Sequence, residues 1–365
     1  MKNARRLFLI LLVGASSIGN VNAQDLEGTL RAGPQDAQTY MQNYMEPAIL
    51  SFANGLANGW VNTAKTHKIL GLDLTFSLNL ATVPDEALTF AYSAYSWQNL
   101  KLASGSDGNL PTLVGGSTDN QLFMEVGATI TDPSTGNSVT YTSETGNFDA
   151  AEGIDISRIP FAGVPTPTLQ LGIGLMKNTD LKIRYVPTIS TDDIEFSMFG
   201  IGVMHDIKQW IPGLKLVPID IAGFFGTTSM NAKIEYEIEQ PELSPGVPDP
   251  DEVFYTDGSG STEFKVSSTT IQILASKKLS FFTPYVAVGY NIVSSSLDVK
   301  GKYIYTNDLG VPLEITDPVS LEFGGGSSPR ATIGAQLKLL VLTIHADYTL
   351  QKYNTFTAGI GISIR

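Results

Sequence analysis

Five apolar side chains alternate with four polar ones in the stretch "LDLTFSLNL", residues 72–80. Successive side chains of a β-strand point to opposite faces, so this stretch predicts a strand with one apolar face and one polar face. Asp73 lies on the polar face. The fold must therefore give an apolar medium to one side of the strand and a polar surrounding to the other.

The same alternation recurs along the chain, for example in "LKIRY", "ATIGAQLKL", "LTIHADYTL" and "FTAGIGISIR". We predict strands that begin near residues 168, 181, 194, 214, 262, 281, 329, 341 and 354. Three or more precede them, near residues 70, 89 and 121, with a further pair between 138 and 160. Short turns alternate with long polar loops, as in transmembrane β-barrels, and an even count predicts roughly 12 to 14 strands.

Lipid is the medium that best suits the apolar faces. Strands of about 10 residues match the length that crosses a bilayer. The alternative is a secreted soluble β-sandwich, which would bury the apolar faces against each other. Its reverse faces would not carry so many glycines, threonines and single charges. We therefore predict an all-β fold, a transmembrane antiparallel barrel over residues 69–365, with outer-membrane lipids as partners. The candidate lumen-facing polar residues are Asp73, Lys182, Arg184, Lys338, His345 and Asp347.

The N-terminus, "MKNARRLFLILLVGASSIGNVNA", has the basic start, short apolar run and small-residue end of a secretory signal peptide cleaved after Ala23. After cleavage, the mature chain is expected in the cell outer membrane. No later apolar run is long enough for a helical membrane protein. A formal charge of −13 argues against a nucleic-acid partner. The absence of cysteine excludes disulfides and thiolate metal sites, and no cofactor or metal site is predicted.

Residues 24–68 lack the alternation and are predicted to form a helical plug. The stretch 34–46 has apolar residues at helical spacing, and Pro47 is expected to end the helix. A short helix with an apolar stripe is unstable alone in water and needs a surface to cover it. The expected plug contacts are Tyr40, Met41, Tyr44 and Met45.

The stretch "NGWVNTAKTHKILGLDL" (58–74), together with "LPTLVGG" (110–116) and the C-terminal "FTAGIGISIR", resembles a family of bacterial outer-membrane barrels of unassigned function. The resemblance covers the whole mature chain. More remotely, the layout is similar to long-chain fatty-acid transporter porins, whose barrels hold an N-terminal hatch. That resemblance implies a channel or transporter for small hydrophobic or amphipathic molecules, but it carries no ligand residue onto this chain.

His345 and Asp347 share the polar face of one strand, which leaves two hypotheses open. A carboxylate-oriented histidine is a general base, so the pair would suit an outer-membrane lipid hydrolase. However, no serine stands in a G-x-S-x-G context. The favoured interpretation is a lumenal hydrogen-bond network with Lys182, Arg184 and Lys338, and no catalytic residue is predicted.

For His67 and for the acidic loop at 235–263, the sequence leaves both a structural and a functional interpretation open. His67, between Lys65 and Lys68, is expected to form a basic collar at the barrel mouth, or else to contact an anion. The acidic loop at 235–263 is expected to be a hydrated loop, although Asp249, Asp251 and Glu252 offer oxygen ligands of the kind Ca²⁺ prefers. A structural or adhesive barrel, with long loops that bind a partner, is a third hypothesis for the whole chain.

Overall fold

The structure is a computed structural model. It describes residues 32–131, 138–144, 146–190, 194–214, 217–237, 255–256, 259–306, 312–317 and 319–364. The chain divides into two compact units: residues up to Ala48 together with Val83–Ile159 form unit 1, and Ile49–Thr82 together with Pro160–Arg365 form unit 2. The predicted signal peptide lies outside the described residues.

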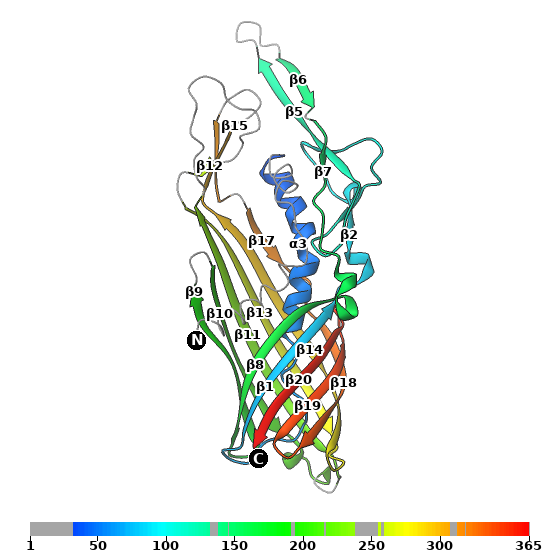
Figure 1. Ribbon diagram of the computed structural model, residues 1–365, viewed down its shortest axis with the longest axis vertical. Coiled ribbons are helices and arrows are strands. Elements are labelled where there is room, and N and C mark those ends of the chain that lie inside the picture. The colour runs from blue at the N-terminus through cyan, green and yellow to red at the C-terminus, as the bar shows by residue number, and fades with distance from the viewer. Residues whose placement is uncertain are drawn as a thin grey trace. The chain divides into compact units, whose positions relative to one another are not determined.

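Unit 2 contains a closed antiparallel barrel (Figure 1). Its ten strands are β1 (Leu72–Thr82), β8 (Gly163–Leu175), β9 (Thr179–Ser190), β10 (Ile194–Asp206), β11 (Asp220–Glu237), β13 (Ser259–Ser276), β14 (Phe282–Lys300), β18 (Ser328–Leu339), β19 (Leu342–Leu350) and β20 (Thr355–Ile364). They pair around the ring in the order β13-β11-β10-β9-β8-β1-β20-β19-β18-β14, and the pairing of β13 with β14 closes it. Every strand predicted from residue 168 onward, and the one near 70, is a strand of this barrel.

Alternation along the barrel strands divides the side chains into an outer and an inner set. β19 is the clearest case, because exposed and buried residues alternate through all nine of its positions. Ile333, with 67% of its surface exposed, and Val288, with 62%, are typical of the outer set. The prediction that the apolar faces point outward from a closed barrel is therefore confirmed.

The predicted count of 12 to 14 strands is wrong, because the described residues form a barrel of ten. The segments near 89, 121 and 138–160 belong to unit 1 instead. There they pair with one another and bury their own apolar side chains, including Phe90 and Leu122. Alternation reports that a strand has two unlike faces, but it does not say which sheet the strand joins.

Unit 1 contains small sheets and short 3-10 turns. Its strands are β2 (Thr89–Ala91), β3 (Leu100–Leu102), β4 (Asn109–Pro111), β5 (Gln121–Thr131), β6 (Ser138–Glu144) and β7 (Phe148–Asp149). β2 pairs with β4, while β5 pairs with β3, β6 and β7. The turns are η1 (Asp85–Ala87), η2 (Tyr92–Ala94) and η3 (Ile156–Arg158). Burial, and after it the charge of Asp36, raises the pKa of Tyr92 in this unit.

Unit 2 has further short elements beyond the ring. β17 (Val319–Phe323) pairs with one end of β14, and η4 (Pro160–Ala162) precedes β8. β12 (Tyr255–Thr256), β15 (Lys302–Thr306) and β16 (Pro312–Thr316) form a separate small sheet. η5 (Lys208–Trp210) lies between β10 and β11.

One helix, α3, runs from Pro34 to Leu56, so the prediction that Pro47 ends it is wrong. A proline inside a helix costs about 3 kcal/mol. The turns beyond Pro47 offset this cost, because Leu50 and Leu56 are almost fully buried and a buried leucine contributes about 1.5–3 kcal/mol. No helix in the described part of the chain is long and apolar enough to cross a membrane.

A plugged barrel interior as the candidate functional site

The inner face of the barrel is largely polar on β1, β8, β9, β18, β19 and β20, whereas β10, β11 and β13 place apolar side chains such as Met204, Phe224 and Leu274 there. Asp73, His345 and Asp347 are buried there, as are Lys182 and Arg184. Lys338 is half-buried, and its Nζ donates to the backbone oxygen of Ser363 at 2.9 Å. All six residues proposed from the sequence as lumen-facing therefore lie on inward positions of their strands.

Residues 49–70, here called the lumenal segment, contact the barrel wall from the inside. The side chain of Gln170 donates to the backbone oxygen of Trp60 at 3.1 Å, and that of Gln336 donates to Asn62 Oδ1 at 3.0 Å. The backbone N–H of Ala64 donates to Ser276 Oγ at 3.0 Å. These wall residues come from β8, β18 and β13, which lie at separate places around the ring. The lumenal segment therefore occupies the interior as a plug would.

Two buried arginines, here called the arginine pair, hold the end of α3. Arg184 donates to the backbone oxygens of Leu56 at 2.7 Å and Asn58 at 2.6 Å. Arg330 donates to the backbone oxygen of Ala57 at 3.0 Å and to Asn58 Oδ1 at 2.7 Å. The last carbonyls of a helix lack partners within the helix and carry a partial negative charge. The arginine pair satisfies both needs.

Arg184 also makes a cation–π contact with an aromatic ring of the lumenal segment. Its guanidinium lies over the ring of Trp60, 3.7 Å from the ring centroid. Trp60 also packs against Phe224, with the ring centroids 5.5 Å apart, in a small buried cluster that includes Met204 and Leu274. The sequence analysis identified Arg184, but it missed Arg330 and Trp60. The sequence did contain a signal for Arg330, because it begins the alternating stretch "RATIGAQLKL" and lies on the face of that strand predicted to point inward.

His67 ties the far end of the lumenal segment to the wall. Its Nδ1 lies 2.8 Å from Asp180 Oδ2, and its backbone N–H donates to Asp180 Oδ1 at 2.8 Å. Its Nε2 lies 3.3 Å from Ser363 Oγ and 3.9 Å from Asp73 Oδ1. His67 is buried, whereas Lys65 and Lys68, with which it was predicted to form a basic collar, are exposed. The two contacts with the carboxylate of Asp180 hold His67 in this buried position.

His345 and Asp347 point inward but do not form a catalytic pair. Ser77 Oγ lies 3.4 Å from His345 Nε2, whereas His345 Nδ1 has no hydrogen-bond partner among the described residues. Asp347 instead accepts a hydrogen bond from Tyr285 at 2.7 Å. A serine hydrolase needs a histidine whose second nitrogen is oriented by a carboxylate. The geometry therefore does not support the hydrolase hypothesis.

Glycine leaves the space that these inward side chains fill. Gly359 lies directly opposite His345 in the pairing of β19 with β20, and a Cβ added to it would overlap the imidazole. Asp347 lies opposite Thr357. On the other side of the ring, Lys182 has a glycine as partner on each neighbouring strand.

The four residues predicted as plug contacts belong to unit 1. Tyr40 and Tyr44 are fully buried in the core of unit 1, their rings stacked at 6.1 Å, and Tyr40 also packs edge-on against Phe90. Met45 packs against the same core, and Met41 is half-buried. The Ca²⁺ interpretation of the acidic loop falls on Asp249, Asp251 and Glu252, which lie outside the described residues. Within the described residues, no group of three or more His, Asp or Glu could hold a metal ion.

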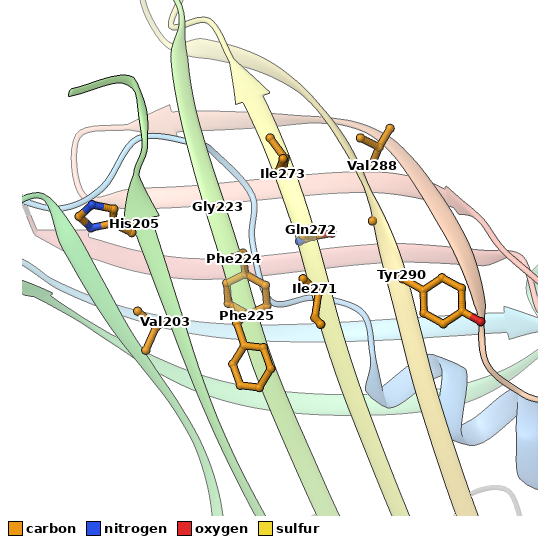
Figure 2. A pocket seen from close by; sticks show the side chains of 11 residues that line it. Val203, His205, Gly223, Phe224, Phe225, Ile271, Gln272, Ile273, Val288 and Tyr290 are labelled. Atoms are coloured by element: carbon orange, nitrogen blue, oxygen red, sulfur yellow. The ribbon is translucent and has the colours of Figure 1, made fainter. Parts of the chain in front are cut away.

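An apolar groove of about 610 Å³ lies on the outer wall, across β10, β11, β13 and β14 (Figure 2). Exposed side chains of Phe225, Ile271, Ile273 and Val288 border it. The inward-facing Phe224, which contacts Trp60 inside the barrel, also contributes to its lining. The groove therefore lies over the aromatic cluster of the lumenal segment.

These features define a closed β-barrel with an apolar outer face, a largely polar inner face and a segment of its own chain inside. The chain belongs to the Family of unknown function (DUF6588), whose model matches residues 1–364. No curated protein matches the sequence.

Several solved structures show a low similarity to this chain. The translocator domain of the autotransporter NalP from Neisseria meningitidis is 10% identical, with a TM-score of 0.27, and the match covers 90% of this chain and 98% of that one. The transport unit of the autotransporter AIDA-I from Escherichia coli is 11% identical, with a TM-score of 0.27, covering 88% and 99%. A mutant of the monoaromatic hydrocarbon channel TodX is 9% identical, with a TM-score of 0.23, covering 88% and 93%. Similarity this low does not assign a function.

Proposed function

We propose that the protein spans the bacterial outer membrane and acts as a plugged channel or transporter for small hydrophobic or amphipathic molecules. The lumenal segment is the plug in this proposal. The observation that carries it is the barrel's inversion relative to a soluble protein, with large apolar side chains outside and charged ones inside.

The outer face supports the membrane part of the proposal. Leu74, Ile273, Ile333 and Ile362 are each about half exposed or more, and they come from strands spread around the ring. Each buried side chain of this size contributes about 1.5–3 kcal/mol, so a ring of them in water would be strongly unfavourable. Soluble monomers rarely expose continuous apolar patches beyond a few hundred Å². Lipid removes this cost.

The plug contacts support the transport part. Most of the contacts given above between the lumenal segment and the wall are hydrogen bonds, and these can be exchanged for water when the segment moves. Four of them involve an arginine, and a hydrogen bond to a charged group contributes about 1.5–3 kcal/mol. The closed barrel is therefore the resting state, and the arginine pair is the largest barrier to opening.

The outer groove supports the class of cargo. Its border is apolar, and it faces the same side as the proposed lipid contact surface. A hydrophobic molecule dissolved in the membrane would reach it without crossing water.

The second candidate is a structural barrel that only carries unit 1. The observation that favours it is the interior itself, where inward side chains are buried and hydrogen-bond to the lumenal segment. In that case the arginine pair would serve stability alone.

The two candidates are separated by an experiment on the full chain in lipid vesicles. The double variant Arg184→Gln/Arg330→Gln is compared with the wild type and with Lys265→Gln, which removes an exposed cation paired with Glu263. Folding is checked by the change in electrophoretic mobility on boiling. We measure ion conductance and transfer of the uncharged probe N-phenylnaphthylamine.

We expect the wild type and Lys265→Gln to transfer the probe above empty vesicles and to conduct little. The double variant should conduct more. If the folded wild type and the folded double variant both fail to transfer the probe and to conduct, the structural barrel replaces the transporter.

A further inference from the structure

The two residues of the arginine pair face each other across the barrel. Arg184 is on β9 and Arg330 is on β18, and these strands are five places apart in either direction around the ring of ten. Both guanidinium groups nevertheless reach the same three residues, 56–58. The pair therefore converges on one point inside the lumen.

Neither guanidinium has a full negative charge as a hydrogen-bond partner. Their partners near the end of α3 are backbone carbonyls and the amide oxygen of Asn58, and among the described residues neither arginine forms an ion pair with a carboxylate. Burying a cation costs several kcal/mol unless its environment compensates. The partial charge at a helix C-terminus is only about half an elementary charge. The charge of Asp347 adds to this compensation for Arg330, but the electrostatic neighbour of Arg184 is Arg330, so the compensation for Arg184 is incomplete.

One donor of the pair has no partner at all. The Nε of Arg330 is buried and makes no hydrogen bond among the described residues. Guanidinium groups bind carboxylate and phosphate through two parallel N–H donors, a geometry that carbonyl oxygens at separate residues do not supply. Two such groups that converge from opposite walls match an anion with several oxygens.

We propose that the arginine pair forms an oxyanion-binding site, which the C-terminal carbonyls of α3 occupy in this conformation and which a phosphate or carboxylate group takes when the lumenal segment moves. The helix end is then an internal competitor of the anion. By linkage, an anion that binds only the displaced state must favour displacement. The inference goes beyond the proposed function, because it requires binding and not transport.

The test uses the absence of cysteine in the wild-type sequence. In the full-length variant Ala57→Cys the new thiol is the only one, at a position that is fully buried and whose side chain makes none of the arginine contacts. The rate of maleimide labelling of the folded barrel reports how often the lumenal segment moves. The probe is inorganic phosphate, compared with chloride at the same ionic strength, followed by acetate as a carboxylate.

We expect phosphate at about ten times its dissociation constant to speed labelling by about tenfold relative to chloride. Acetate should act in the same direction. With Arg330→Gln added, labelling should be fast in chloride and should not respond to phosphate. Arg330→Lys, which keeps the charge but loses the planar fork, should retain only part of the response. Ala150→Cys, at a buried alanine of unit 1, reports general unfolding and should not respond.

Equal labelling rates in phosphate and chloride would overturn the site. So would a phosphate response that persists in the folded Arg330→Gln variant, or one that Ala150→Cys shares. None of these outcomes depends on conductance or probe transfer, so the site and the proposed function fail separately.

Discussion

We predict that replacing Asp36 with alanine lowers the free energy of unfolding of unit 1. The carboxylate of Asp36, which is almost fully buried, accepts backbone hydrogen bonds from Gln98 at 2.8 and 3.1 Å, Asn99 at 2.7 Å and Leu100 at 2.8 Å. It also lies in the first turn of α3, where a negative charge is favourable. One side chain thus joins the start of the helix to the start of β3.

The cost of Asp36→Ala follows from what its three donors would meet afterwards. Leu100 is fully buried, so its N–H would lose its only acceptor without access to water, at about 1–3 kcal/mol. Gln98 is exposed and Asn99 half-buried, so water would replace much of their bonding, at about 0.5–1 kcal/mol each. Together with the helix dipole, the loss is about 3–5 kcal/mol in the free energy of unfolding of unit 1.

The assay is urea unfolding of the full chain followed by fluorescence of Trp97. Trp60→Phe and Trp210→Phe remove the other two tryptophans. The matched control is Asp85→Ala, an exposed carboxylate in unit 1 whose removal should change the unfolding free energy by less than about 0.5 kcal/mol. If Asp36→Ala and Asp85→Ala shift the Trp97 transition equally, the reasoning from buried backbone donors is refuted.

Further predictions concern the barrel wall and one exposed carboxylate. Gly359→Ala should impair folding in lipid by crowding the imidazole of His345, and adding His345→Ala should restore it; boiling-dependent mobility measures both, and an absence of rescue would contradict the packing. His345→Gln alone should leave assembly and probe transfer nearly intact. Ile333→Lys should destabilise the inserted barrel by about 2–4 kcal/mol, measured by urea titration in vesicles, and an unchanged midpoint would argue against lipid at this position. The backbone N–H of Asn109 and then the side-chain amide of Asn120 lower the pKa of Asp107. The stability that Asp107 contributes should therefore be present above its ordinary pKa and should be lost as the pH falls through the lowered pKa. The variant Asp107→Asn should flatten this pH dependence of stability.

The barrel strands could be predicted from the sequence because each needs only its own residues to show two unlike faces. The stretch 342–350 alternates without a break, and β19 has the same bounds. Strands β2, β3 and β4 are three residues long, too short for alternation to reveal their sheet. The strand count was overestimated because β5 and β6, with 11 and 7 residues, are also strands, but they join a sheet of unit 1 and not the barrel.

The contacts of the interior could not be predicted in the same way, because they join residues far apart in the chain. The alternation of its strand was enough to place Arg184 on the inner face. The neighbouring sequence does not indicate that its partners are backbone carbonyls 128 and 126 positions earlier. Pro47 shows the same limit, since its local preference to end a helix is outweighed by the burial of Leu50 and Leu56. His67 was predicted to form a basic collar with its two lysine neighbours, but Asp180, 113 positions away, holds it in a buried position.

Those same long-range contacts hold the lumenal segment, which is the plug in the proposed function. Its backbone is held from β8, β9, β13 and β18, so no single wall strand controls it. Arg184, which holds two of these carbonyl oxygens, has the like charge of Arg330 as its electrostatic neighbour, so the closed state does not fully compensate its buried charge. An anion would supply that missing charge only if the end of α3 moved away. The arrangement that stabilises the plug thus also determines which class of ligand would release it.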